Sequence, residues 1–149
     1  MNKHVFNIGK DQLSVGLALE LERGKRSIGL SEDTRDRIQA SREAVETIDN
    51  RKEVVYGINT GFGPLCTTII SESETRKLQE NLLRSHSVGV GDNIPTDISR
   101  LMLVLKLQSL AKGYSGIALT TLVRIIWHLV IDVVPVGPSQ GAVGASGDL

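Results

Sequence analysis

The segment from 115 to 131 constrains the fold of this chain more than any other part of the sequence. The slightly longer stretch 117–134 approaches the length of a membrane span, but Arg124, His128 and Asp132 recur in it at every fourth position. We therefore expect a helix inside a bundle rather than a membrane helix. Its apolar residues cover more than one stripe, which predicts burial on several sides; they are Leu119, Leu122, Val123, Ile125, Ile126, Leu129 and Val130.

Three other segments carry helix signals. Ser31, followed by two acidic residues, predicts a helix over 31–50 whose inner face carries Ile38. Ser71 and Glu74 form a capping box that opens a second helix. Pro95-Thr96-Asp97 opens a third, which we expect to stop near Gly113.

Extended segments are expected to be short. Residues 54–56 and 133–136 are predicted to be extended, and the glycines in 57–68 predict a shaped loop between helices. Aromatic residues make up 3% of the chain, so the core must be built from Leu, Ile, Val and Ala. The sequence predicts a mainly helical fold with short extended segments and glycine-rich loops.

Composition disfavours several classes of partner. Seventeen basic and seventeen acidic residues give a net charge of zero, so nucleic acid and membrane surfaces are not expected partners. No His, Cys or acidic residues have metal-ligand spacing, so no metal is expected. A single cysteine, Cys66, and the lack of a secretory signal predict a cytoplasmic protein.

The last loop, GPSQGAVGASGDL, can carry unusual chemistry. If the fold compresses Ala145-Ser146-Gly147, the Gly147 nitrogen can attack the Ala145 carbonyl, because glycine has no Cβ to obstruct it. Ring closure releases one water and loss of the Ser146 hydroxyl releases another, which leaves an electrophilic methylidene carbon on an imidazolone. Taken alone, the same residues fit an ordinary turn in which Asp148 caps a helix.

Two further motifs accompany that loop. They are YGINTGFGPL, which begins at Tyr56, and NLLRSHSVGVG, which contains Ser85 and His86. In this order and at these separations, the three motifs resemble the histidine ammonia-lyase family, whose wider group includes phenylalanine and tyrosine ammonia-lyases and aminomutases. The resemblance runs from about Leu13 to Leu149.

The resemblance implies a fold, an assembly and a prosthetic group. It implies the N-terminal part of the ammonia-lyase helical fold and a cytoplasmic homotetramer with active sites shared between subunits. The group is 4-methylidene-imidazol-5-one (MIO), formed from Ala145, Ser146 and Gly147 with no external cofactor. Family members are much longer, so we expect 1–149 to be an N-terminal domain or fragment that ends just after the MIO-forming loop and is inactive alone.

The resemblance also assigns roles to residues. Tyr56 matches the base that removes the β-proton, which requires surroundings that stabilise a phenolate. Ser85 and His86 match substrate-pocket positions, and this pair is typical of histidine-specific members, although some bacterial tyrosine lyases and aminomutases share it. Asn59 and Gly61 are expected either to face the substrate or only to shape the turn. Asp148 is expected to support the loop.

These roles imply non-oxidative deamination of a small amino acid, L-histidine, to trans-urocanate and ammonia. One alternative has the same chemistry on another substrate, as a tyrosine or phenylalanine ammonia-lyase or an aminomutase. A second alternative is a non-enzymatic helical module whose glycine-rich loop binds an anion through backbone amides.

Overall fold

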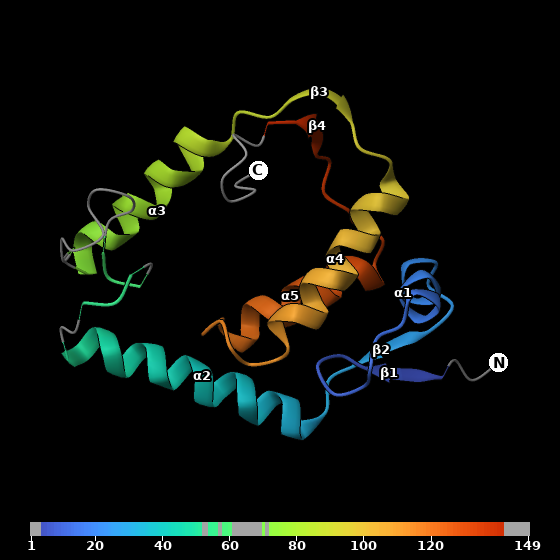
Figure 1. Ribbon diagram of the computed structural model, residues 1–149, viewed down its shortest axis with the longest axis horizontal. Coiled ribbons are helices and arrows are strands. Elements are labelled where there is room, and N and C mark those ends of the chain that lie inside the picture. Colours follow the sequence, from blue (N-terminus) through green and yellow to red (C-terminus); the bar gives the residue numbers. More distant parts are fainter. Residues whose placement is uncertain (1–3, 52–53, 57, 61–69, 71, 142–149) are drawn as a thin grey trace. The chain divides into compact units, whose positions relative to one another are not determined.

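The computed structural model describes residues 4–51, 54–56, 58–60, 70 and 72–141 (Figure 1). The described residues are mainly helical, which confirms the predicted fold class. The helices are α1 (Val15–Glu22), α2 (Glu32–Arg51), α3 (Glu72–His86), α4 (Thr96–Leu110) and α5 (Leu119–Val130). The strands are β1 (Val5–Asn7), β2 (Ser27–Gly29), β3 (Val90–Asn93) and β4 (Pro138–Gln140).

The chain falls into two compact units. The first unit comprises residues 1–44 and 94–137 and contains β1, α1, β2, most of α2, α4 and α5. The second unit comprises residues 45–93 and 138–149 and contains the end of α2, α3, β3 and β4. Each strand therefore pairs within its own unit.

The first unit has an aliphatic core. Strands β1 and β2 pair in parallel, with Phe6 opposite Ile28, and α4 packs against both α1 and α5. Parallel neighbours need a crossover, and α1 supplies it. One aromatic side chain joins the aliphatic ones, as the composition predicts; the clustered core residues are Phe6, Ile8, Leu21, Ile38, Val104, Leu107, Ala111, Leu122 and Leu129.

The predicted helices are largely confirmed. Helix α2 begins after Ser31, whose Oγ accepts the Thr34 N–H at 3.3 Å, and Ile38 is buried at 1% exposure. Helix α4 begins after Pro95, and Gly113 lies just beyond its end with φ +79°. Helix α3 begins at Glu72, but the predicted capping residue Ser71 lies outside the described residues.

The helix predicted over 115–131 starts later than expected. Gly116 has φ +65° and donates its N–H to Ser41 Oγ at 3.0 Å, so the helix begins only at Leu119. The predicted burial on several sides is wrong for this chain: Leu122 and Leu129 are buried, but Val123 is 43% exposed and Val130 is 69% exposed, as is the neighbouring Trp127 at 44%. One face of α5 is therefore apolar and accessible.

Neither predicted extended segment forms a strand. The Val55 N–H donates to Asn59 Oδ1 at 3.0 Å, so it serves a turn rather than a ladder. After α5, Asp132 adopts φ +61° and the Val133 N–H returns to the His128 carbonyl at 3.0 Å. The following strand is β4, which lies beyond the predicted segment. Most of the predicted loop 57–68 lies outside the described residues.

A buried amide ties the start of the chain to α4. Gln108 Oε1 accepts the Gly9 N–H at 3.0 Å, and Gln108 Nε2 donates to the Asp11 carbonyl at 3.1 Å. Gly9 has φ +79°, and a Cβ there would lie 2.4 Å from the Ala111 carbonyl oxygen. Both the backbone conformation and the close approach therefore require glycine at this position.

We expect Gly9→Ala to lower the free energy of unfolding by about 3 kcal/mol, because strain and overpacking add together. Gly24→Ala is the matched control: its φ is +63°, but a Cβ would meet nothing within 4 Å. We expect that control to cost about 1 kcal/mol, from backbone strain alone. Urea unfolding of both variants measures the difference, and equal losses would contradict the close approach.

Candidate active site

The tyrosine predicted as the base lies in a turn to which residues 54–56 and 58–60 belong. The Ile58 N–H donates to the Val55 carbonyl at 3.1 Å, and the Asn59 carbonyl accepts the Ile70 N–H at 3.0 Å. The Asn59 side chain is 3% exposed, whereas Tyr56 is 61% exposed. A buried asparagine thus organises the turn and leaves the tyrosine accessible.

The predicted substrate pair lies at the carboxyl end of α3. Ser85 Oγ donates to the Leu82 carbonyl at 3.2 Å, and His86 Nδ1 lies 2.8 Å from Ser85 Oγ and 3.1 Å from the same carbonyl. A carbonyl oxygen only accepts, so both contacts are favourable only when Nδ1 carries the proton. This geometry favours the Nδ1–H tautomer of neutral His86, in which Nε2 is the acceptor.

An antiparallel ladder joins the two ends of the second unit. Val90 of β3 pairs with Gln140 of β4, and Asn93 pairs with Pro138 (Figure 1). Because the strands run in opposite directions, the segment that arrives from His86 and the segment that leaves Gln140 lie at the same end of the ladder. Ala145 follows Gln140 by five positions in the sequence. The sequence did not predict this pairing, because Pro138-Ser139-Gln140 has no alternation of apolar and polar residues.

The second unit contains every described residue predicted for the site. These are Tyr56 and Asn59, which share a turn, and Ser85 and His86, which share a helix end. The other predicted positions lie outside the described residues: Gly61, Ala145, Ser146, Gly147 and Asp148.

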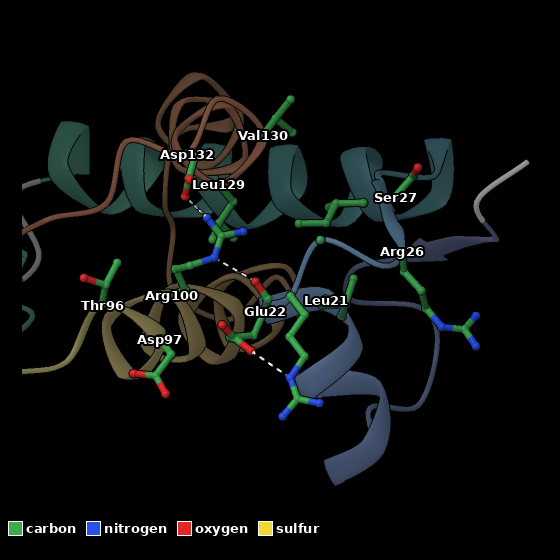
Figure 2. Close-up of a pocket in the computed structure, with 13 residues that line it drawn as sticks. Leu21, Glu22, Arg26, Ser27, Thr96, Asp97, Arg100, Leu129, Val130 and Asp132 are labelled. Atoms are coloured by element: carbon green, nitrogen blue, oxygen red, sulfur yellow. Dashed lines mark hydrogen bonds and ion pairs between the residues drawn. The ribbon is translucent and has the colours of Figure 1, made fainter. Parts of the chain in front are cut away.

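A separate cleft of about 730 Å³ lies in the first unit, between the end of α1 and the helices α4 and α5 (Figure 2). Arg100 crosses it, donating Nε to the Glu22 carbonyl at 2.7 Å and pairing with Asp132. Its charged lining is balanced, with three arginines and three carboxylates: Arg23, Arg26, Arg100, Glu22, Asp97 and Asp132. None of the predicted site residues that the structure describes lines this cleft, and all of its lining residues belong to the first unit.

The described residues contain no group of three His, Cys, Asp or Glu side chains that could hold a metal ion. Among those residues, no helix has both the length and the apolar character needed to cross a membrane.

Comparison with known proteins identifies the family. The model of the family described as aromatic amino acid lyase matches residues 13–149. The chain belongs to this family. Members of the aromatic amino acid lyase family are carbon–nitrogen lyases that use an MIO group.

Individual members of the family are similar to this chain in sequence and in fold. Histidine ammonia-lyase from Streptococcus sanguinis is 41% identical over 98% of the chain and 28% of its own length. The crystal structure of histidine ammonia-lyase from Trypanosoma cruzi has 38% identity and a TM-score of 0.82, over 95% of the chain and 27% of that structure. Tyrosine aminomutase from Streptomyces globisporus has 29% identity and a TM-score of 0.84 over the same shares.

The chain therefore spans between a quarter and a third of the length of these relatives. The fold match confirms that it has the architecture of the N-terminal part of the ammonia-lyase fold.

We expect neutral His86 to be protonated at Nδ1, because Ser85 and Leu82 both present oxygens to that nitrogen. Long-range ¹H–¹⁵N correlation spectra of the selectively labelled chain at alkaline pH distinguish the two ring nitrogens. His128 is an internal reference, since its Nδ1 lies 3.2 Å from the Val133 carbonyl and needs the same tautomer. A proton on Nε2 of His86 would show that the helix-end geometry is wrong.

Proposed function

We propose that this chain carries the N-terminal catalytic residues of a histidine ammonia-lyase, which converts L-histidine to trans-urocanate and ammonia. The observation that carries the proposal is the gathering of Tyr56, Asn59, Ser85 and His86 in one compact unit. The ladder between β3 and β4 adds the strand that leads to Ala145. The identity of 41% to a histidine ammonia-lyase supports the choice of substrate.

The tripeptide Ala145-Ser146-Gly147 is proposed to form the MIO group of the family. When formed, this group supplies an electrophilic carbon that no standard side chain offers. The residues fit such a ring: Ala145 is small, Ser146 has a hydroxyl to lose and Gly147 has no Cβ. The ladder supports this assignment, because it anchors the chain at Gln140, just before the tripeptide. Asp148 is proposed to hold the loop geometry.

Tyr56 is proposed to remove the β-proton of the substrate. The electrons of the C–H bond then form the C=C bond of urocanate, and the C–N bond breaks with its electron pair going to nitrogen. The protonated amino group thus leaves as ammonia, while Tyr56 holds the proton that it removed. The buried Asn59 holds the turn in shape, because its Oδ1 accepts a hydrogen bond from the Val55 N–H. Asn59 and Gly61 are also proposed to line the substrate side of this turn.

Ser85 and His86 are proposed to recognise the substrate's imidazole ring. In the Nδ1–H tautomer, His86 Nε2 can accept a hydrogen bond from a ring N–H of the substrate. Phenylalanine has no such donor, so its binding would leave this acceptor unpaired. The pair therefore favours histidine over a purely apolar side chain.

The site is proposed to be completed by further polypeptide in a homotetramer. Tyr56, Ser85 and His86 are all exposed in this chain, whereas proton abstraction from carbon benefits from a site closed to water. In the relatives, the polypeptide outside the matched region is more than twice as long as that region, and it could close the site to water. A cytoplasmic location fits a chain with the single cysteine Cys66.

One alternative substrate class has specific support. The similarity to tyrosine aminomutase from Streptomyces globisporus favours a tyrosine-directed lyase or aminomutase as the second candidate. Such an enzyme would bind a phenol ring at His86, and an aminomutase would return ammonia to the β-carbon. Its products would be coumarate or a β-amino acid rather than urocanate.

A chimaera tests the proposed function. Residues 1–149 replace the matching part of the Streptococcus sanguinis relative, and the unaltered relative is the positive control. We expect the purified chimaera to have an intact mass lower by two waters and to release urocanate from L-histidine. The isolated chain should keep its full mass. A chimaera that folds without the mass deficit would refute the enzyme proposal, and release of coumarate without urocanate would refute the substrate.

Tyr56→Phe in the same chimaera removes the proposed base without changing the ring-forming tripeptide. We expect kcat to fall at least about a hundredfold, as for loss of a general base, with the two-water deficit retained. Tyr114→Phe is the matched control, because Tyr114 is 91% exposed and lies in the first unit. Unchanged kcat in Tyr56→Phe would remove this residue from the proposed mechanism.

A further inference from the structure

The entry to strand β3 lies against the start of strand β4 with no room for a side chain. A Cβ built on Gly89 would lie 2.0 Å from Pro138 Cγ, 3.1 Å from Pro138 Cβ and 3.2 Å from Pro138 Cδ. Real Cβ atoms do not approach other atoms so closely, and a proline ring cannot swing aside as a flexible side chain can. Gly89 does not have a positive φ, so the need for glycine here comes from contact alone.

The next glycine fixes the register of the same ladder. The two strands pair at Val90 with Gln140 and at Asn93 with Pro138, so β3 contains one more residue than β4 between these pairs. Gly91 lies within this bulge with φ +86°, a conformation that bulges commonly assign to glycine. A Cβ on Gly91 would lie 3.1 Å from Ser139 Oγ.

These contacts control where β4 ends. Gly89 follows His86 by three positions, and Ala145 follows Gln140 by five. If Pro138 moves away from Gly89, the pairing of β4 with β3 is disturbed, including that of Gln140 with Val90. The path of the chain toward Ala145 then starts from a different place relative to α3.

We propose that Gly89 is a positioning residue for ring formation: its missing side chain lets Pro138 pack on the β3 backbone and sets the register of β4, the strand that precedes Ala145-Ser146-Gly147 in the sequence. This inference rests on the proposed function. Gly89 touches neither substrate nor the reacting atoms, and it acts through Pro138 and the ladder.

The first experiment tests the spacing in the 149-residue chain, independently of any ring. Val90→Cys and Gln140→Cys are introduced together with Cys66→Ser. Directly paired residues in an antiparallel ladder have Cα atoms about 5 Å apart, which suits a disulfide. We expect mild oxidation to link the two cysteines, and adding Gly89→Ala to reduce the linked fraction roughly tenfold, as a small overpacking cost would.

A second substitution tests whether the effect of Gly89→Ala comes from its contact with Pro138. Pro138→Ala removes the Cγ and Cδ atoms that the new side chain would meet. We expect Gly89→Ala with Pro138→Ala to regain the cross-link, and Gly16→Ala to leave it unchanged, since a Cβ on Gly16 meets nothing within 4 Å. Equal cross-linking in Gly89→Ala and the parent would overturn the proposal.

The second experiment measures ring content in the chimaera described above, by intact mass and near-ultraviolet absorbance per folded molecule. We expect Gly89→Ala to lower the ring fraction roughly tenfold and the double variant to restore it. Gly113→Ala is the destabilising control: its φ is +79° and its Cβ would lie 3.1 Å from the Arg37 carbonyl oxygen, far from the ladder in sequence. It should lower Tm while keeping the ring.

The outcomes separate the two proposals. If Gly113→Ala and Gly89→Ala lose the ring equally at matched Tm, the effect of Gly89→Ala comes from lower overall stability. That result would overturn the positioning role of Gly89. A parent chimaera without the ring would refute the proposed function, and the positioning role with it, whatever the cross-link shows. A ring in the parent that persists in Gly89→Ala would overturn the positioning role alone.

Discussion

The antiparallel pairing of β3 with β4 is the contact on which the candidate site depends. The chain leaves the second unit at Asn93, builds α4 and α5 in the first unit, and returns at Pro138. Closing so long an excursion has an entropic cost, and the ladder that closes it is only a few residues long. Each close contact within the ladder therefore contributes a large share of the constraint. Gly89 has no space for a side chain beside Pro138, and Gly91 has φ +86° with Ser139 Oγ close by.

The elements that the sequence predicted correctly are those with local signals. Helix α2 begins at a serine cap and α4 after a proline, and both signals act within one turn of the helix. Helix α1 was not predicted, because its eight residues are too few to show a clear period. Strands β1 and β2 were missed for a related reason: each has three residues, and their parallel pairing exists only across α1. The late start of α5 depends on Ser41, which is distant in sequence from Gly116.

The candidate site shows the same division between local and long-range information. The family motifs pointed to Tyr56, Asn59, Ser85 and His86, and family membership is now shown, whereas their roles rest on the proposed function. The sequence left Asn59 open between substrate contact and turn formation, and its buried Oδ1 is engaged with the Val55 N–H. The proton position on His86 could not be predicted, because it depends on where Ser85 Oγ and the Leu82 carbonyl lie at a helix end.

The described parts of the two units differ in what holds them together. In the described residues, every buried apolar side chain belongs to the first unit, from Phe6 to Leu129, and the buried side chains of the second unit are the polar Asn59 and Thr60. Hydrogen bonds contribute little net stability when their groups can bond to water instead, so a turn and a short ladder hold a unit less firmly than an apolar core does. Compressing three residues into a ring needs firm surroundings. The described part of the unit that carries the proposed chemistry thus gains more from additional packing than the first unit does, which fits relatives more than three times as long as this chain.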